Sequence, residues 1–308
     1  MPPFSDLIAA HVEPQSGELR ERFALATPFS HCVIEGFFDP AFAQSLLQDF
    51  PGFDQGNHLN EDGVAGGKST VEQIHDLGAP YQRLDDLIQG KEFLGSIERI
   101  TGIPNLLYDP HYFGGGTHEN RDGQSLDSHI DFNYHPATGW HRRLNLIVYL
   151  NPEWQDDWGG ALELHRDPYD QATDEVVTIS PTFNRCVIFE TTEHSWHGFA
   201  PIRLPETAAG LSRRSIALYF YTRERPEAQT ASRHSTIYVD RPLPGHIVAG
   251  RTLTERDVAE IQELLARRDG HNRRLYDEVR SLYASLDRSF ASRLFSAARR
   301  FIARRRPG

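Results

Sequence analysis

The sequence predicts a mainly β protein, an antiparallel sandwich or barrel, with helices before and after the β region along the chain. Between residues 105 and 222, short runs rich in β-branched and aromatic residues alternate with Gly, Pro, Asn and Asp. The segments before residue 105 and after residue 250 show helical patterns instead. The β runs are LLYDPHYF, HIDFNYH, LNLIVYL, ALELH, EVVTI, RCVIFE and SIALYFYT.

The residues before the β region predict one strand followed by helices. HCVIEGFF at 31–38 has the composition of a strand. Asp39 and Pro40 then supply an N-cap and a first-turn proline for a helix through about Phe50. Residues 52–70, rich in Gly, Asn and Asp, are expected to form a loop. Helical patterns return over 71–101 and end at Thr101-Gly102-Ile103-Pro104.

We expect two domains. The first covers residues 1–240, with its β core at about 105–222, and the second is a helical extension over 250–308. In the extension, Thr252 or Thr254 is a plausible cap for a helix over 255–268, and a second helical segment covers about 271–306.

Charge and cysteine content limit the partners and the compartment. The net charge is −11, which argues against nucleic acid as a partner because binding phosphates requires a basic surface. The first residues, MPPFSDLIAAHVEPQ, lack the basic and apolar regions of a secretory signal. Cys32 and Cys186 are expected to be reduced residues of the core, so a cytoplasmic location is predicted.

The C-terminal end is basic. Seven arginines and no acidic residue lie between Arg288 and Arg306, and Phe290, Leu294, Phe301 and Ile302 could form one apolar helical stripe. Such a helix can lie on an anionic membrane, which would give peripheral membrane contact. The preferred alternative is that the stripe packs on the domain or on a second subunit, with the arginines in water.

A metal site is predicted from the sequence His129-Ile130-Asp131. Residues two apart on a strand point to the same face, so both side chains would enter one cavity. A third ligand would complete a set of two histidines and one carboxylate, which leaves coordination positions open for non-haem Fe(II) and oxygen chemistry. The same spacing recurs at His165 and Asp167, but that pair precedes a charged, solvated-looking loop.

Two histidines and two arginines compete for the remaining roles. His197 is preferred over His194 as the third ligand because it follows the buried-looking strand RCVIFE and sits in the tight sequence SWHG. Arg213 and Arg214 begin the last β run, and strand alternation places them on opposite faces. An arginine at the end of an apolar cavity can bind a carboxylate through two parallel hydrogen bonds.

Taken in order, these blocks resemble a known family. His-x-Asp-Phe-Asn, RRLNLIVYLN, WGGALELH, FNRCVIFE, SWHG and R-x-S-I-A-L-Y resemble the Fe(II)/2-oxoglutarate-dependent oxygenases of the prolyl-4-hydroxylase-like superfamily, in particular a bacterial subgroup. The resemblance covers about residues 28–240. It implies a double-stranded β-helix, the jelly-roll fold that cupins share, and a dioxygenase that hydroxylates a C–H bond with release of succinate and CO2.

The resemblance also implies roles for individual residues. His129, Asp131 and His197 would bind Fe(II), and Arg213 would bind the C5 carboxylate of 2-oxoglutarate. Tyr112 aligns with a tyrosine that often hydrogen-bonds the cosubstrate carboxylate, and ascorbate is the expected reductant. The resemblance does not identify the substrate, so small molecules, peptides and glycans all remain open.

Two other classes of protein share such a barrel. A cupin-like metal-dependent isomerase or epimerase would have no use for Arg213 and would turn over without O2. A non-catalytic binding module would keep the barrel but not the metal, and the presence of all three ligands and the arginine disfavours it.

Overall fold

Antiparallel strands dominate the computed structural model, which describes residues 6–283 except 60–64, 171, 240–242, 244, 256, 263, 267, 274 and 278. The chain divides into two compact units. The first comprises residues 1–58 and 66–240, and the second comprises residues 59–65 and 241–308. The basic stretch for which packing on protein and membrane contact are the alternatives, residues 288–306, lies outside the described residues.

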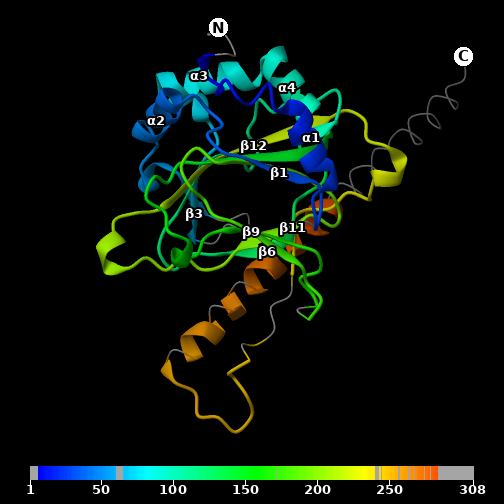
Figure 1. The fold of residues 1–308 in the computed structure, drawn as a ribbon. Helices are drawn as coiled ribbons and strands as arrows, with labels where there is room; N and C mark the ends of the chain where they lie inside the picture. Colours follow the sequence, from blue (N-terminus) through cyan, green and yellow to red (C-terminus); the bar gives the residue numbers. More distant parts are fainter. Residues whose placement is uncertain are drawn as a thin grey trace, which may run out of the picture. The chain divides into compact units, whose positions relative to one another are not determined.

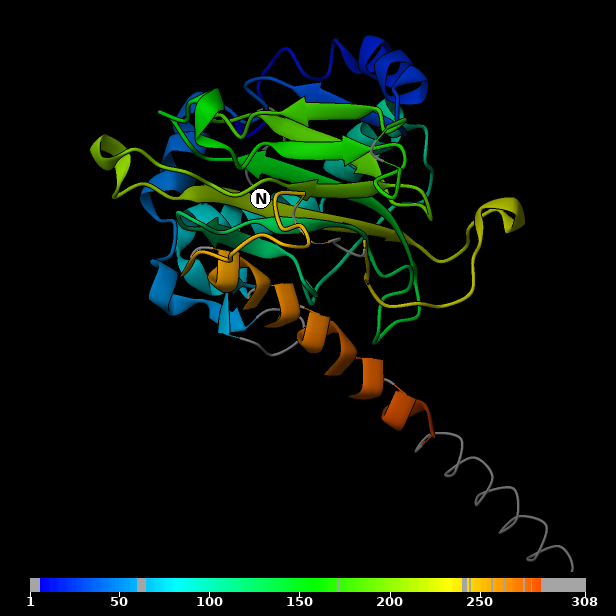
Figure 2. The ribbon, with the colours of Figure 1, turned by 90° about the horizontal axis from the view of Figure 1, so that it is seen from below.

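Two antiparallel sheets lie opposite each other in the first unit (Figure 1). Figure 2 shows the same fold from below, where strands lie side by side. They form the double-stranded β-helix core that the resemblance implies. The larger sheet has eight strands, in the order β1 (His31–Ile34), β10 (Cys186–Glu190), β7 (His141–Tyr149), β12 (Arg213–Thr222), β5 (Gly116–Asn120), β3 (Ala65–Val71) and β2 (Asn57–Leu59), with β4 (Leu107–Tyr108) paired to β12. The smaller sheet has five, in the order β13 (Ile237–Tyr238), β6 (Leu126–Ile130), β11 (Trp196–Phe199), β8 (Leu162–His165) and β9 (Val176–Ile179).

Helices cover the outer face of the larger sheet (Figure 1). Their buried residues, such as Leu46, Leu84 and Ile97, share one hydrophobic core with Leu146 and Val148 of β7. The α-helices of the described first unit are α1 (Ser16–Leu25), α2 (Pro40–Gln48), α3 (Ala79–Ile88) and α4 (Lys91–Thr101), and the short 3-10 helices are Phe53–Gln55, Ile74–Leu77, Asp156–Trp158, Glu206–Ala208 and Glu227–Gln229.

Two predicted helix boundaries are confirmed. Helix α2 begins at Pro40 because the Asp39 carboxylate accepts hydrogen bonds from the backbone N–H groups of Ala41 (2.9 Å) and Phe42 (3.1 Å). Helix α4 ends at Thr101, and the following Gly102 has a φ of 73°, in the left-handed region that favours glycine at a helix end.

The prediction of a loop over residues 52–70 is wrong in part. This segment contains β2 and most of β3, and residues 74–77 form a 3-10 helix where an α-helical pattern was expected. Strand β3 pairs with β5 through Ser69 opposite Glu119, Thr70 opposite His118 and Val71 opposite Thr117. Pairing with a distant strand therefore outweighs the low strand preference of this glycine-rich sequence.

Strand alternation determines which side chains face the space between the sheets. On β7, Leu144, Leu146 and Val148 pack toward the helices, whereas Tyr149 belongs to a core formed with residues of the smaller sheet. Ser215 of β12 lies directly opposite Tyr149. Direct partners share a face, so Arg213, Ser215, Ala217 and Tyr219 also lie on the inner face of the larger sheet.

The second unit is helical wherever it is described between Glu255 and Tyr283. Thr254 caps this helix by a reciprocal pair of bonds, from the Thr254 N–H to Asp257 (2.8 Å) and from the Asp257 N–H to the Thr254 hydroxyl (3.2 Å). The expected interruption between residues 268 and 271 is not there, because a single glycine costs a helix only about 1 kcal/mol. None of the helices that the structure describes is long and apolar enough to cross a membrane.

Candidate metal centre

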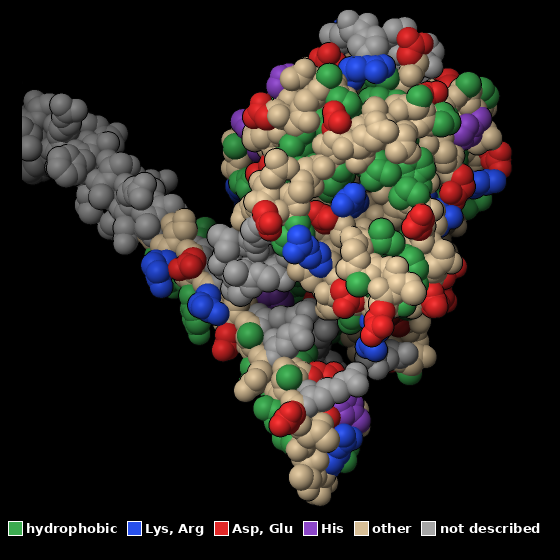
Figure 3. Space-filling view, turned by 90° about the vertical axis from the view of Figure 1, so that its left-hand side faces the viewer, with side chains coloured by type: hydrophobic (Ala, Val, Ile, Leu, Met, Phe, Trp, Pro, Cys, Tyr) green, Lys and Arg blue, Asp and Glu red, His purple; other side chains and the backbone are tan. Residues whose placement is uncertain are grey.

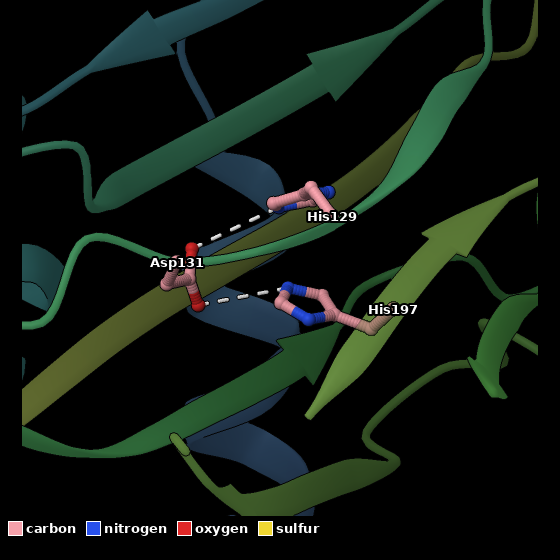
Figure 4. Close-up of side chains that lie close together, drawn as sticks. All are labelled: His129, Asp131 and His197. Atoms are coloured by element: carbon pink, nitrogen blue, oxygen red, sulfur yellow. Dashed lines mark ion pairs between the residues drawn. The ribbon is translucent and has the colours of Figure 1, made fainter. Parts of the chain in front are cut away.

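The predicted ligands meet between the two sheets (Figure 4). His129 lies on β6, Asp131 follows the end of that strand, and His197 lies on β11, directly opposite His129. Nε2 of His129 is 3.7 Å from Oδ1 of Asp131, and Nε2 of His197 is 3.6 Å from Oδ2. One ligand atom from each residue lies within 4.8 Å of the others, and all three side chains are at least nine-tenths buried. The structure therefore places three metal-ligating groups where they can bind one face of a single metal ion.

Backbone carbonyls orient both imidazole rings. Nδ1 of His129 donates to the carbonyl of Asp127 at 2.8 Å, and Nδ1 of His197 donates to the carbonyl of Ser195 at 2.9 Å. With the proton on Nδ1, each ring presents the lone pair of Nε2 toward Asp131, as histidine ligands of metals do. The donor set and its support fit a divalent metal ion of the Fe(II) type.

The protonation states also suit metal binding. Burial alone would raise the pKa of Asp131, but Arg142, His197, His129 and a hydrogen bond from Asn145 together hold it well below its usual range. Burial and the neighbouring His129 together lower the pKa of His197 to about 3, although the charge of Asp131 opposes them. A carboxylate and a neutral imidazole are thus present at neutral pH, and a metal ion need not displace a proton from either.

The competing residues lie elsewhere. His165 is bonded to Asp174 at 2.7 Å, and Asp167 is an exposed residue that accepts a hydrogen bond from the Tyr169 N–H. His194 is exposed in the turn before β11. Within the residues that the structure describes, no other group of three His, Cys, Asp or Glu side chains has a geometry suited to a metal ion.

Arg213 is buried at the start of β12, and Arg214 points to the opposite face. Nε of Arg213 donates to the Gly160 carbonyl at 2.6 Å, and Nη2 donates to the Tyr149 hydroxyl at 3.3 Å. Its Nη1 donates to no protein atom among the described residues, which leaves a donor for an anion. Arg214 is 36% exposed and lies 3.4 Å from Glu119. The two arginines thus separate as strand alternation predicts.

Tyr112 does not lie beside Arg213, so its expected placement is corrected. Its hydroxyl donates to Asp85 of α3 at 2.7 Å, and its ring belongs to the core between the larger sheet and the helices. The tyrosine beside the arginine is Tyr149. Sequence reasoning missed it, although it ends the RRLNLIVY block, because its position depends on how β7 pairs with β12.

A second missed residue borders the metal centre. Tyr238 of β13 lies opposite His129 in the sheet, and the two ring centroids are 5.2 Å apart. Asn133, which lies just after β6, holds the segment that precedes β13. Its side chain donates a hydrogen bond to the Ser232 carbonyl (2.8 Å) and accepts one from the His234 N–H (3.0 Å). Residues 232–238 therefore lie alongside the metal centre.

The fold and site define a double-stranded β-helix protein with a two-histidine, one-carboxylate metal centre. Residues 115–221 match the family model "2OG-Fe(II) oxygenase superfamily", and this range includes the three ligands and Arg213. Over these residues the chain is similar to that superfamily. The assignment to a bacterial subgroup stays a prediction.

Individual known proteins are also similar to this chain. The prolyl 3-hydroxylase OGFOD1 of Mus musculus is 28% identical over 233 residues, which cover 71% of this chain and 39% of that protein. A prolyl 4-hydroxylase structure from Phytophthora capsici superposes with a TM-score of 0.51 at 18% identity, covering 88% of this chain and 76% of that one. A prolyl hydroxylase from Trichoplax adhaerens has a TM-score of 0.49 at 20% identity, covering 72% and 95%. The chain thus spans about two fifths of the curated relative, and the structural likeness concerns the fold.

Proposed function

We propose that the chain is a 2-oxoglutarate-dependent dioxygenase that hydroxylates a C–H bond of its substrate and releases succinate and CO2. The observation that carries this proposal is the position of Arg213 on the inner face of the sheets that enclose His129, Asp131 and His197. A metal face that leaves open positions and a buried arginine with a free donor are what a dicarboxylate cosubstrate needs.

Each residue has a proposed role. His129, Asp131 and His197 would hold Fe(II), which with the cosubstrate supplies O2 activation and removal of a substrate hydrogen. Arg213 would bind the C5 carboxylate of 2-oxoglutarate, with Tyr149 as a second donor to the same group and the Gly160 carbonyl fixing the guanidinium. Burial of these groups excludes water and strengthens their hydrogen bonds to the cosubstrate. Ascorbate is the proposed reductant.

The substrate proposal is a prolyl residue in a peptide or protein. It is supported by the 28% identity to a protein named prolyl 3-hydroxylase, and small molecules and glycans are its competitors. A cytoplasmic location is proposed because Cys32 and Cys186 are buried, unpaired thiols. Peripheral membrane contact through residues 288–306 stays a prediction beside the alternative of packing on protein.

Succinate formation tests the proposed reaction. The full chain is incubated with Fe(II), 2-oxoglutarate and ascorbate, first alone and then with proline-containing peptides, and succinate is quantified. We expect succinate from the wild type, more of it with an accepted peptide, and a mass increase of one oxygen in that peptide. Metal binding without any succinate would support the isomerase or the binding module instead, and absence of metal binding would contradict the site itself.

A further inference from the structure

Two residues of the RRLN block, Arg142 and Asn145, contact the proposed metal carboxylate. Nη2 of Arg142 lies 3.1 Å from Oδ2 of Asp131, and Nδ2 of Asn145 donates to the same oxygen at 2.7 Å. Nε and Nη2 of Arg142 also donate to Oδ1 of Asn145, at 3.1 and 2.8 Å. The three side chains thus form a closed triangle at Oδ2 of Asp131, held by hydrogen bonds of Asn145 to both partners and by the ion pair between Arg142 and Asp131.

The two oxygens of Asp131 are therefore not equivalent. Oδ2 accepts a hydrogen bond from Asn145 and forms the ion pair with Arg142, whereas Oδ1 accepts a hydrogen bond from none of the residues that the structure describes. A carboxylate oxygen without donors keeps its lone pairs for a cation. The hydrogen bond and the ion pair at the other oxygen hold the group in one orientation, as partners of metal ligands commonly do.

Arg142 also brings a fixed positive charge to the centre. Its side chain is 1% exposed, and its guanidinium carbon lies 3.7 Å from the ring centroid of Tyr219 and 4.4 Å from that of Phe132. Burial limits screening by water. Because Coulomb repulsion scales with the charge of the ion, this guanidinium disfavours a trivalent ion more than a divalent one.

We propose that Arg142 and Asn145 are positioning residues that hold Asp131 through Oδ2 and leave Oδ1 for the metal ion, and that the charge of Arg142 favours the ferrous over the ferric state. This inference rests on the proposed function only in that iron binds at His129, Asp131 and His197. It assigns the RRLN block to the metal rather than to the substrate.

The charge is tested by the balance between the two iron states. Iron-loaded protein without 2-oxoglutarate is equilibrated under nitrogen with one fixed ratio of ferricyanide to ferrocyanide. Each ferrous ion that is oxidised passes one electron to ferricyanide, which becomes ferrocyanide. The fraction of ferric iron is then measured by EPR. We expect Arg142→Gln to raise the ferric-to-ferrous ratio about tenfold or more, and Arg142→Lys to keep it within about threefold of the wild type.

A neighbouring residue provides the matched control. Arg143 is also buried, at 7% exposure, but it contacts Glu190 at 3.2 Å instead of Asp131. Arg143→Gln should leave the iron ratio unchanged, and an equal rise in both variants would overturn the role of Arg142. Arg142→Met, whose apolar chain can still lie over the ring of Tyr219, is the second variant if Arg142→Gln does not fold, as judged by circular dichroism.

The positioning role has its own readout. Asn145→Ala removes a bond to Oδ2 but keeps the guanidinium, so we expect Mn(II) affinity to fall about tenfold with an iron ratio close to the wild type. Unchanged Mn(II) affinity would overturn the positioning role, and an unchanged ratio in Arg142→Gln would overturn the charge effect. If the wild type binds neither Mn(II) nor iron, or binds them equally well without Asp131, the proposed function fails instead.

Discussion

His129 and His197 are direct partners across the antiparallel pair of β6 and β11, and their ring centroids are 4.3 Å apart. This register places both Nε2 atoms on the inner side of the smaller sheet, next to Asp131. A shift of the pairing by one residue would turn one imidazole to the outer face, so the register itself is a condition for the site. The bonds from both Nδ1 atoms to carbonyls then restrict the rings.

The first prediction concerns the metal carboxylate. Asp131→Ala should abolish succinate formation and weaken Mn(II) binding by about tenfold or more, because one ligand of three is lost along with its hydrogen-bonded support. Isothermal titration with Mn(II) and the succinate assay measure the two effects.

Asp167→Ala is the control for this change. It removes a carboxylate from the second His-x-Asp sequence, which is exposed and lies apart from a third ligand. Both the Mn(II) affinity and the turnover of this variant should equal those of the wild type. Equal losses in the two variants would mean that the wrong motif has been assigned to the metal.

How much of this site the sequence predicts depends on how far apart along the chain the interacting residues lie. His129 and Asp131 could be paired because strand alternation is a local property, and the same holds for the opposite directions of Arg213 and Arg214. Tyr149 could not be placed beside Arg213, because that contact depends on the pairing of β7 with β12. For the same reason β3 was expected to be a loop: its pairing with β5 is a long-range contact, while its composition is that of a turn.

The second prediction concerns acid stability of the metal-free protein. His197 has a pKa of about 3 in the folded state, because of burial and of His129, against about 6.5 in an unfolded chain. Between these values the unfolded state binds one more proton, so stability falls as the pH falls from 6.5 toward 3. The loss from this group is about 1.4 kcal/mol for each pH unit, and urea unfolding at pH 7 and pH 5 measures it.

The contribution of His197 can be isolated with His197→Phe, which cannot be protonated. The difference in unfolding free energy between pH 7 and pH 5 should be about 2 kcal/mol smaller in this variant than in the wild type. His194→Phe, which changes an exposed histidine three residues earlier, should keep the wild-type difference. A wild-type difference in His197→Phe would contradict the lowered pKa.

The third prediction separates two tyrosines. Tyr149→Phe removes the hydroxyl that contacts Arg213, so the KM for 2-oxoglutarate should rise by about threefold to tenfold. Tyr112→Phe removes a hydroxyl that donates to Asp85, so it should lower stability by about 1 kcal/mol and leave that KM unchanged. Succinate kinetics and thermal unfolding measure these effects, and the reverse pattern would return Tyr112 to the cosubstrate.

The last prediction concerns the arginine that would bind the cosubstrate. Arg213→Ala should raise the KM for 2-oxoglutarate at least about tenfold, because a charge-assisted pair of hydrogen bonds contributes on the order of 2–3 kcal/mol. Arg213→Lys should recover part of this loss, since a lysine keeps the charge but not the two parallel donors. Arg214→Ala provides the matched control, because it removes a guanidinium that lies on the opposite face beside Glu119. Its KM should stay within about twofold of the wild type, since this guanidinium points away from the face that carries Arg213. If the two alanine variants exchanged their effects, the inner face of β12 would carry the even-numbered residues, and the register of Ser215 opposite Tyr149 could not be correct.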